Sequence, residues 1–476
     1  MGALRERAGK SAGESRQRRN ARRKGRSEEG DVRLGPRVES HRVFVDMFAG
    51  CGGLSLGLLT AGWSGLFAAE KDELAFETLK HNLIEGTGTF RYQWPDWLPQ
   101  ESITINRLAK IYGRNLKKLR GKVDLLAGGP PCQGFSLAGR RRKDDPRNAL
   151  FGQYVRVVEA IEPNFLLLEN VRGIDVEFGK KKKEKQEKKN GRRRGPGRPP
   201  SAFSQKIKRK LEAIGYAVFP KLVKAFEFGV PQRRPRYIII AIRRKLLKGR
   251  ADFDPFESLE TVRLNFLKAK KLPVDSPVSV KEALSDLETV GKKLIECVDS
   301  AGFKQITYSA PLTHYQRLLH GSMNGTAPNS LRLAKHQDEI RKRFAGILKT
   351  CRRGVQLSKH DRERLGLNKH CTVPLDAAKP SHTLTTLPDD ILHYSEPRIL
   401  NVREYARLQS FPDWYAFKGK YTTGGDRRVR ECPRYTQVGN AVPPFLGECL
   451  GRLLSAIAEE LTGTLSVEDT RGQDAA

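Results

Sequence analysis

A cysteine in a turn rich in proline and glycine is the side chain of this sequence best suited to covalent chemistry. The turn is Pro130-Pro131-Cys132-Gln133-Gly134-Phe135-Ser136, and it directly follows the apolar run 123–129. Open α/β sheets present reactive groups at the carboxyl ends of their strands. A cysteine acts as a nucleophile through its thiolate, which positive surroundings favour, and residues 140–143 are all basic. The pattern therefore favours a nucleophile over the buried, inert cysteine that is the commoner alternative.

An acid and a group of arginines also stand beside apolar strand candidates. Glu169 follows the apolar run 165–168, where a carboxylate is costly to bury unless it is protonated or hydrogen-bonded. Such an acid can share a proton with a ring nitrogen, and the alternative is an acid that faces solvent. Arg234 and Arg236 run into the apolar stretch 237–242, where a guanidinium fork can reach a carbonyl or phosphate oxygen. The alternative for either arginine is a basic loop.

A glycine-rich turn indicates a cofactor site. Phe48-Ala49-Gly50-Cys51-Gly52-Gly53 lies between a strand candidate and a helix candidate, where glycines let the backbone approach a ligand closely. The spacing is not GxGxxG, which argues against a dinucleotide. Glu70, at the end of the next strand candidate, can accept both ribose hydroxyls of a nucleoside. The weaker segment 437–444 has a glycine and an amide before a helix, and it suits a contact on the cofactor side.

The elements that must position these residues alternate between strand and helix. Such alternation predicts an α/β fold with a doubly wound, mostly parallel sheet. The expected strands are 43–48, 66–69, 123–127, 165–168 and 237–242, and the expected helices are 54–61, 73–82, 402–411 and 444–461.

The alternation is lost from about 245 to 379, which predicts a second, smaller domain. Basic segments without large apolar groups cannot offset the entropy of ordering. We therefore expect a disordered basic arm (1–40), a catalytic domain (41–245) with a basic insertion (177–205), the smaller domain (246–400), a return to the catalytic domain (401–465) and a tail (466–476).

Composition restricts the class of protein further. The 476 residues contain 88 Lys and Arg against 54 Asp and Glu, a net charge of +34, which indicates a polyanionic partner rather than a merely soluble basic protein. The seven cysteines form no CxxC pair, which disfavours a disulfide framework or a metal site. There is no secretory signal in residues 1–42 and no apolar run of membrane-spanning length. We expect a cytoplasmic protein.

Taken in order, six blocks of the sequence resemble the DNA cytosine-5 methyltransferases, which use S-adenosylmethionine. The resemblance covers about residues 42–245 and 379–460, and six blocks in the family's order are very improbable by chance. The blocks are FAGCGG, PPCQGFS, ENV, QRRPR, ARLQSFP and QVGNAVPP.

The resemblance implies a Rossmann-like methyltransferase sheet, a smaller target-recognition domain and a role for each matched residue. Cys132 would add to C6 of a flipped-out cytosine, Glu169 would hold the N3 side, and Arg236 would bind O2. Arg234 would either support Arg236 or contact DNA. Gln133, Ser136 and Thr383 would contact DNA. The residues implied to line the cofactor pocket are Phe48, Gly50, Gly52, Gly53, Glu70, Asn440 and Val442.

The chain departs from the family pattern in two places. The family has an Asp-Ile pair for the adenine amino group, whereas this chain has Glu101-Ser102-Ile103-Thr104-Ile105-Asn106, without an acid clearly in place. The insertion contains Gly197-Arg198-Pro199, half of a minor-groove AT-hook, and we interpret it as a nonspecific phosphate-binding segment.

Three functions remain open from the sequence. The first is a bacterial-type DNA methyltransferase, either paired with a restriction endonuclease or an orphan, that acts as a monomer on double-stranded DNA. The second is a tRNA cytosine-5 methyltransferase on the same scaffold, for which the segment 245–379 is long. The third is a catalytically silent DNA-binding protein, against which Cys132, Glu169 and Arg236 argue.

Overall fold

The computed structural model describes residues 42–86, 88–130, 148–171, 203–367, 371–424, 427 and 430–462. The chain divides into two units, 1–40 and 41–476. The first unit, which was expected to be a basic arm, lies outside the described residues, as does most of the insertion. The description below concerns the second unit.

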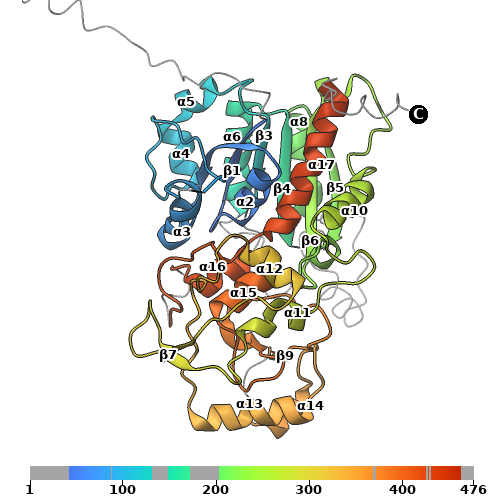
Figure 1. Ribbon diagram of the computed structural model, residues 1–476. Coiled ribbons are helices and arrows are strands. Elements are labelled where there is room, and N and C mark those ends of the chain that lie inside the picture. Colours follow the sequence, from blue (N-terminus) through green and yellow to red (C-terminus); the bar gives the residue numbers. More distant parts are fainter. Residues whose placement is uncertain are drawn as a thin grey trace, which may run out of the picture. The chain divides into compact units, whose positions relative to one another are not determined.

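Six strands of the described residues form the central sheet, in the order β2-β1-β3-β4-β6-β5 (Figure 1). The strands β1 to β4 pair in parallel, and β6 runs antiparallel to both β4 and β5. The mostly parallel, doubly wound sheet predicted from the sequence is confirmed. The bounds are β1 (Val43–Met47), β2 (Ser64–Ala69), β3 (Leu125–Gly128), β4 (Phe165–Val171), β5 (Tyr216–Lys224) and β6 (Pro235–Arg243).

The strand order reverses at β1, because β2 lies on one side of it and β3 on the other. Ligands of open α/β sheets bind at such a switch point, beyond the carboxyl ends of the strands. The glycine-rich turn follows β1, and Gly129 and Pro130 follow β3. The topology therefore brings the predicted cofactor turn and the start of the cysteine turn to one edge of the sheet.

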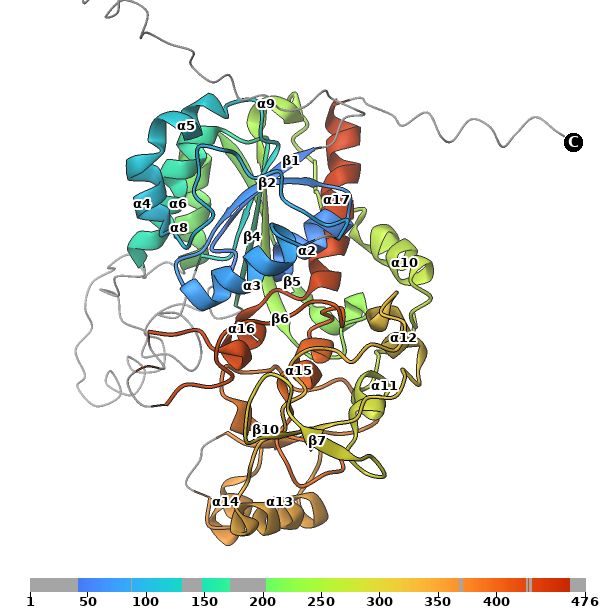
Figure 2. The same ribbon diagram turned by 60° about the vertical axis from the view of Figure 1, so that its left-hand side comes forward.

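Two layers of helices cover the sheet (Figure 2). One layer contains α4 (Ile105–Ile111), α5 (Gly113–Lys118), α6 (Asn148–Ile161) and α8 (Phe203–Ala213), which pack on one another. The other contains α2 (Gly53–Thr60), α10 (Leu259–Ala269) and α17 (Pro444–Thr462), with α17 packed on both partners. The helix α3 (Glu73–Leu83) begins after Asp72, whose side chain accepts a hydrogen bond from Ala75 N at 3.0 Å.

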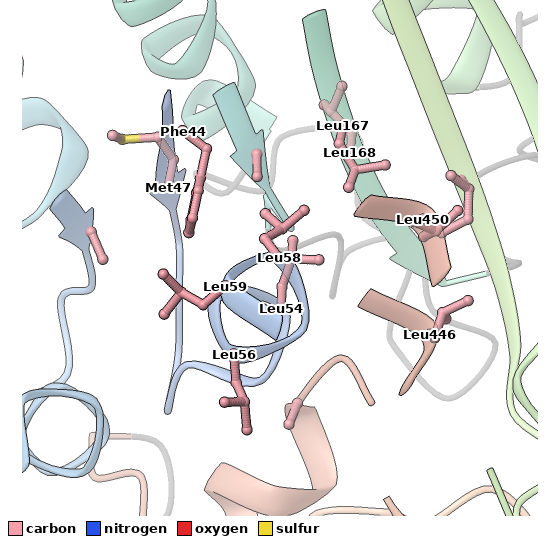
Figure 3. Packing of buried hydrophobic residues seen from close by; sticks show 14 of the residues in the cluster. Phe44, Met47, Leu54, Leu56, Leu58, Leu59, Leu167, Leu168, Leu446 and Leu450 are labelled. Carbon is pink, nitrogen blue, oxygen red and sulfur yellow. The ribbon is translucent and has the colours of Figure 1, made fainter. Parts of the chain in front are cut away.

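The main core includes side chains from both layers of helices, and Figure 3 shows the part between the strands and the layer of α2 and α17. Parallel strands covered on both faces read as continuous apolar runs, which is why the sequence predicted four of them well. Side chains of α2, β4 and α17 meet here, and all of them are buried: Leu54, Leu58, Leu167, Leu168, Leu446 and Leu450.

Within the described residues, one helical stretch, Arg434–Thr462, is long and apolar enough by length and composition to cross a membrane. Its apolar window is 83% buried inside the protein. Because α17 contributes to the core between the helices and the sheet, we interpret this stretch as core rather than membrane-spanning.

The strand β5 was not predicted from the sequence. Its sequence contains Pro220 and two lysines, which hide the apolar alternation. Because β5 is the outermost strand beside β6, it can accept a proline without losing a central ladder hydrogen bond. The strand β4 also extends three residues beyond the predicted run, so Glu169 lies within the strand.

The segment 244–400 contains short elements, as the loss of alternation indicated. Side chains of α10, α11 and α12 belong to the main core, whereas two small separate cores form farther on, around Phe344 and Ile347 and around Leu287 and Ile306. The elements are α9 (Arg244–Leu247), α11 (Val280–Leu284), η3 (Ser285–Leu287), β7 (Leu294–Glu296), β8 (Lys304–Ile306), α12 (His314–His320), α13 (Asp338–Thr350), α14 (Lys359–Arg364), β9 (Val373–Pro374), η4 (Pro388–Asp390) and β10 (Ile391–Leu392).

The chain then returns to the sheet through two short helices, α15 (Val402–Leu408) and α16 (Arg434–Asn440). Asn401 and Glu404 form a capping box that fixes where α15 begins. A further short turn, η2 (Ala225–Phe228), precedes β6. After α16, the chain lies beside the glycine turn that follows β1, since a Cβ added at Gly53 would lie 2.3 Å from Val442 O.

Candidate active site

The turn after β1 has the backbone geometry of a ligand cradle. Gly50 has φ +57°, and a Cβ added there would meet nothing within 4 Å, so the space beside its backbone is open. Gly53 is different, since a Cβ there would lie 2.3 Å from Val442 O. Glycine at position 53 therefore lets the start of α2 approach the 441–443 segment closely. The structure thus brings together the residues Gly53 and Val442 that the sequence assigned to one pocket.

Glu70 fastens this turn to the end of β2. Its Oε2 accepts from Gly50 N at 3.0 Å, and its Oε1 accepts from Asp72 N at 2.9 Å. The carboxyl is half-buried, and burial raises its pKa even though these two amides favour the ionised form. Each carboxylate oxygen keeps a further lone pair for a ligand hydroxyl.

The remaining predicted cofactor residues border the same turn. Phe48 adopts φ +61°, a strained conformation for a residue with a side chain, and packs against the core. Gly52 is the N-cap of α2. Asn440 is the last residue of α16 and is exposed. An open glycine backbone, a helix N-terminus and a paired carboxylate fit a nucleoside cofactor such as S-adenosylmethionine.

The segment that replaces the family's Asp-Ile pair lies beside Glu70. Ile103 N donates to Glu70 O at 2.7 Å, and Thr104 caps α4 through Arg107 N at 3.2 Å. Ser102, directly before Ile103, is half-buried. The segment is therefore a helix start rather than a strand end.

Glu169 and Arg236 form the central charged pair of the site. Arg236 Nε lies 2.5 Å from Glu169 Oε1, and the two side chains are 7% and 11% exposed. Burial lowers the pKa of Arg236, and the Glu169 carboxylate opposes that shift. A Cβ added at Gly129 would lie 3.5 Å from Glu169 Oε2, so this carboxylate faces the end of β3. The pair predicted from two separate motifs thus meets at the edge that carries the cofactor turn.

Arg234 is engaged within the protein. It is buried, and its guanidinium donates to Gly439 O and Ala441 O at 3.0 Å and to Leu384 O at 3.5 Å. Thr383 lies in the adjoining loop, where its Oγ1 donates to Arg233 O at 3.3 Å. Arg234 therefore joins the loop of Thr383 to the cofactor-side segment.

Cys132, Gln133 and Ser136 lie outside the described residues. The described chain before them ends at Pro130, whose carbonyl oxygen accepts from Asn170 Nδ2 at 3.0 Å. The cysteine turn therefore departs from a point fixed to β4, one residue away from Glu169.

Sequence reasoning missed three buried amides that organise the site: Asn170, Gln232 and Gln409. All three are buried. The sequence did contain a signal for these amides, since each lies within or directly beside a matched block. A polar residue in such a block that has no role in the chemistry indicates a structural hydrogen bond.

Within the described residues, no group of three or more His, Cys, Asp and Glu side chains is arranged to hold a metal ion.

Comparison with known proteins identifies the family of this chain. The model of the C-5 cytosine-specific DNA methylase family matches residues 43–456. The chain is 29% identical to the type II methyltransferase M.DdeI of Desulfomicrobium norvegicum, over 88% of this chain and 89% of the relative. It is 31% identical to M.PspPI of a Psychrobacter species, over 88% and 80%.

Among solved structures, the fold resembles that of a DNA modification methyltransferase encoded within a prophage of E. coli. The TM-score is 0.58 at 24% identity, covering 88% of this chain and 99% of that one, and this likeness concerns the fold alone. The resemblance predicted from six blocks is confirmed by the family model. Because that model spans most of the sequence, the chain belongs to the family of C-5 cytosine-specific DNA methylases.

Proposed function

We propose that Cys132, Glu169 and Arg236 carry the chemistry of this DNA cytosine-5 methyltransferase. The observation that supports the assignment best is the buried Glu169–Arg236 pair, 2.5 Å apart, at the sheet edge that also carries the glycine turn. Cys132 follows Pro130 by two residues, which span at most about 7 Å. This short connection would let the Cys132 thiol reach a base that the pair holds.

The chemical problem is that C5 of cytosine is too poor a nucleophile to take a methyl group. A base inside a duplex is also out of reach and must be flipped out of the helix. The Cys132 thiolate forms a bond to C6, while Glu169 holds the N3 side and stabilises the charge that develops in the ring. C5 then has the reactivity of an enamine carbon. Arg236 holds the Glu169 carboxylate and donates to O2 of the base.

When bound, S-adenosylmethionine supplies an electrophilic methyl group on its sulfonium sulfur. We propose that the open backbone at Gly50 and the carboxylate of Glu70 hold this cofactor, with Phe48, Gly52, Gly53, Asn440 and Val442 around it. After methylation of C5, water takes the C5 proton, the electron pair of the C5–H bond re-forms the C5–C6 double bond, and the Cys132 thiolate is expelled. The cysteine is thus regenerated for the next cycle.

Arg234 has a positioning role in this proposal, because its guanidinium is already bound by three carbonyl oxygens. Thr383 would contact the backbone of the target strand, and Gln133 and Ser136 would contact DNA from the cysteine turn. The segment 246–400 would supply the target-recognition domain between the catalytic segments 41–245 and 401–465.

We also propose that the enzyme works as a monomer in the cytoplasm, on the nucleoid. Relatives named type II methyltransferases support a companion endonuclease that cuts the same site. If such a companion exists, DNA methylated by this enzyme resists that nuclease. An orphan enzyme would leave the host viable when its gene is deleted.

The test compares the wild-type enzyme with Cys132→Ser, using labelled S-adenosylmethionine and either duplex DNA or tRNA. We expect label in duplex DNA with the wild type, none with the variant, and DNA binding retained by both. Cys297→Ser is the matched control, because Cys297 is a buried thiol that contacts Asp299 in the β7–β8 hairpin. Methyl transfer by Cys132→Ser would overturn the assignment, and label in tRNA alone would change the substrate.

A further inference from the structure

Two buried glutamines meet between the cofactor side and the DNA side of the site. Gln232 precedes β6 and Gln409 follows α15, and neither side chain is exposed. Gln232 Nε2 donates to Gln409 Oε1 at 2.8 Å and to Leu408 O at 3.1 Å. Buried amides of this kind are costly unless every donor and acceptor is used.

Each glutamine uses its other end on a different segment. Gln232 Oε1 accepts from Leu384 N at 3.0 Å, directly after Thr383. Gln409 Nε2 donates to Val438 O at 2.7 Å and to Ala441 O at 3.3 Å, on the two sides of Asn440. The pair therefore forms a continuous hydrogen-bonded connection between the 381–385 loop and the end of α16, residues 438–441.

A second connection runs beside the first. Arg234 donates to Leu384 O on one side and to Gly439 O and Ala441 O on the other. A Cβ at Gly439 would lie 2.3 Å from Thr385 O, so the two segments are also in direct backbone contact. Neither segment can move by an ångström without the other unless buried hydrogen bonds break.

The end of α16 also packs on the glycine turn 50–53, the proposed cofactor cradle. Gly53, at the start of α2, approaches Val442 O so closely that a Cβ would lie 2.3 Å away. Cys51 Sγ lies 3.6 Å from Gln437 O. A ligand that restricts the motion of the 50–53 turn therefore also restricts the 438–441 segment, to which Gln409 and Arg234 are hydrogen-bonded.

We propose that the Gln232–Gln409 amide pair couples the cofactor pocket to the loop that places Thr383 on the target strand, so that cofactor and DNA bind cooperatively. The proposal rests on the roles assigned above to Thr383, Asn440 and Val442. An amide pair suits this role because its donor and acceptor ends are fixed, and a displaced loop leaves a buried group unpaired. Linkage requires the effect to be reciprocal, with each ligand strengthening the other equally.

The experiment measures the affinity of S-adenosylhomocysteine, which supports no turnover, by calorimetry with and without a duplex that carries the methylated site. For the wild type we expect the duplex to lower the Kd about tenfold, within the usual range of coupling between sites. In Gln232→Met and in Gln409→Met, we expect this ratio to fall well below tenfold without reaching one, because the Arg234 connection remains, and the double variant should lose nothing more.

Gln305→Met is the matched control. Gln305 is a buried glutamine in β8 that accepts from Val298 N, remote in sequence from the site blocks, and its removal should keep the tenfold ratio. An unchanged ratio in both site variants would overturn the coupling, as would a ratio lost equally in the control. If the enzyme methylates DNA but the ratio is unaffected, only the coupling fails. If no methylation of DNA occurs in the wild type, the proposed function fails instead.

A measurement on the unaltered protein covers the case in which a variant does not fold. Hydrogen exchange of the Leu384 amide, which donates to Gln232, should slow by about tenfold when S-adenosylhomocysteine is added without DNA. Exchange at Leu384 that does not respond to this ligand would contradict the proposal.

Discussion

Glu169 and Arg236 meet diagonally across two antiparallel strands. Arg236 is paired in register with Val171, and Glu169 lies two residues before Val171 on β4. Diagonal neighbours on one face of a sheet are within reach of long side chains. The arrangement places a carboxylate and a guanidinium in contact at a position where neither is solvated, so each depends on the other.

We expect Glu169→Gln to lose both activity and stability. The variant keeps the shape of the side chain but leaves Arg236 buried without its counter-charge, which costs about 3–5 kcal/mol of unfolding free energy. The kcat for methylation should fall at least about 100-fold, the size typical of losing one preorganised electrostatic group. Methylation kinetics and urea unfolding measure the two effects.

Glu162→Gln is the control for this variant. Glu162 forms an ion pair with Arg243, which lies on β6 like Arg236, but the side chain of Glu162 is 36% exposed. Exposed pairs of this kind contribute about 0–1 kcal/mol. Activity should be unchanged in this variant. Equal losses in the two variants would mean that the Glu169–Arg236 pair has no special role.

We expect Gly53→Ala to weaken cofactor binding. The new Cβ would lie 2.3 Å from a backbone oxygen, that of Val442, so a backbone segment and not a flexible side chain must move. Calorimetry with S-adenosylhomocysteine should show a loss of at least about tenfold in affinity, together with a lower Tm. Gly113→Ala, where a Cβ meets nothing within 4 Å at the start of α5, should leave affinity unchanged. An affinity for Gly53→Ala equal to that of the wild type would argue against the close approach.

The stability of the enzyme should fall as pH rises from about 4 to 7 in a way that depends on Asp46. Burial raises the pKa of Asp46 to about 7; the hydrogen bond from Ser55 Oγ lowers it, and the neighbouring Glu70 charge raises it. The folded protein therefore holds a proton that the unfolded chain releases in this window, and each unit of the difference is worth about 1.4 kcal/mol.

Asp46→Asn removes this proton without losing the acceptor for Ser55. Its unfolding free energy in urea should therefore depend less steeply on pH between 5 and 7.5 than that of the wild type. Parallel pH profiles for the two proteins would exclude Asp46 as a source of the dependence.

We expect the basic insertion to bind DNA without sequence preference. Replacing 178–200 by a Gly-Ser linker of equal length should weaken binding to all duplexes and flatten the slope of log K against log salt, since fewer counterions are released. Binding isotherms at several salt concentrations measure this slope. The same slope with and without the insertion would sink the interpretation.

The sequence predicted the parallel strands because full burial makes them continuous apolar runs. It could not reveal β5, because Pro220 and two lysines interrupt the apolar pattern of this strand. These residues are tolerated because β5 is the outermost strand of the sheet. Glu169 and Arg236 were each identified from local chemistry, but their contact depends on the antiparallel register of β4 and β6, which no local pattern encodes. Arg234 differs from Arg236 only in its partners, three carbonyls from distant segments, so residue type alone could not separate their roles.

The packing of α17 on α2 has a consequence for how the enzyme is made. Trp63 Nε1, just beyond α2, donates to Gly451 O at 3.0 Å, and Gly57 leaves room for the backbone of residues 444–448. Of the helices in the described residues, the first is therefore covered by the last. In a nascent chain, α2 therefore lacks the packing partner that covers it until α17 has left the ribosome and can fold back onto it.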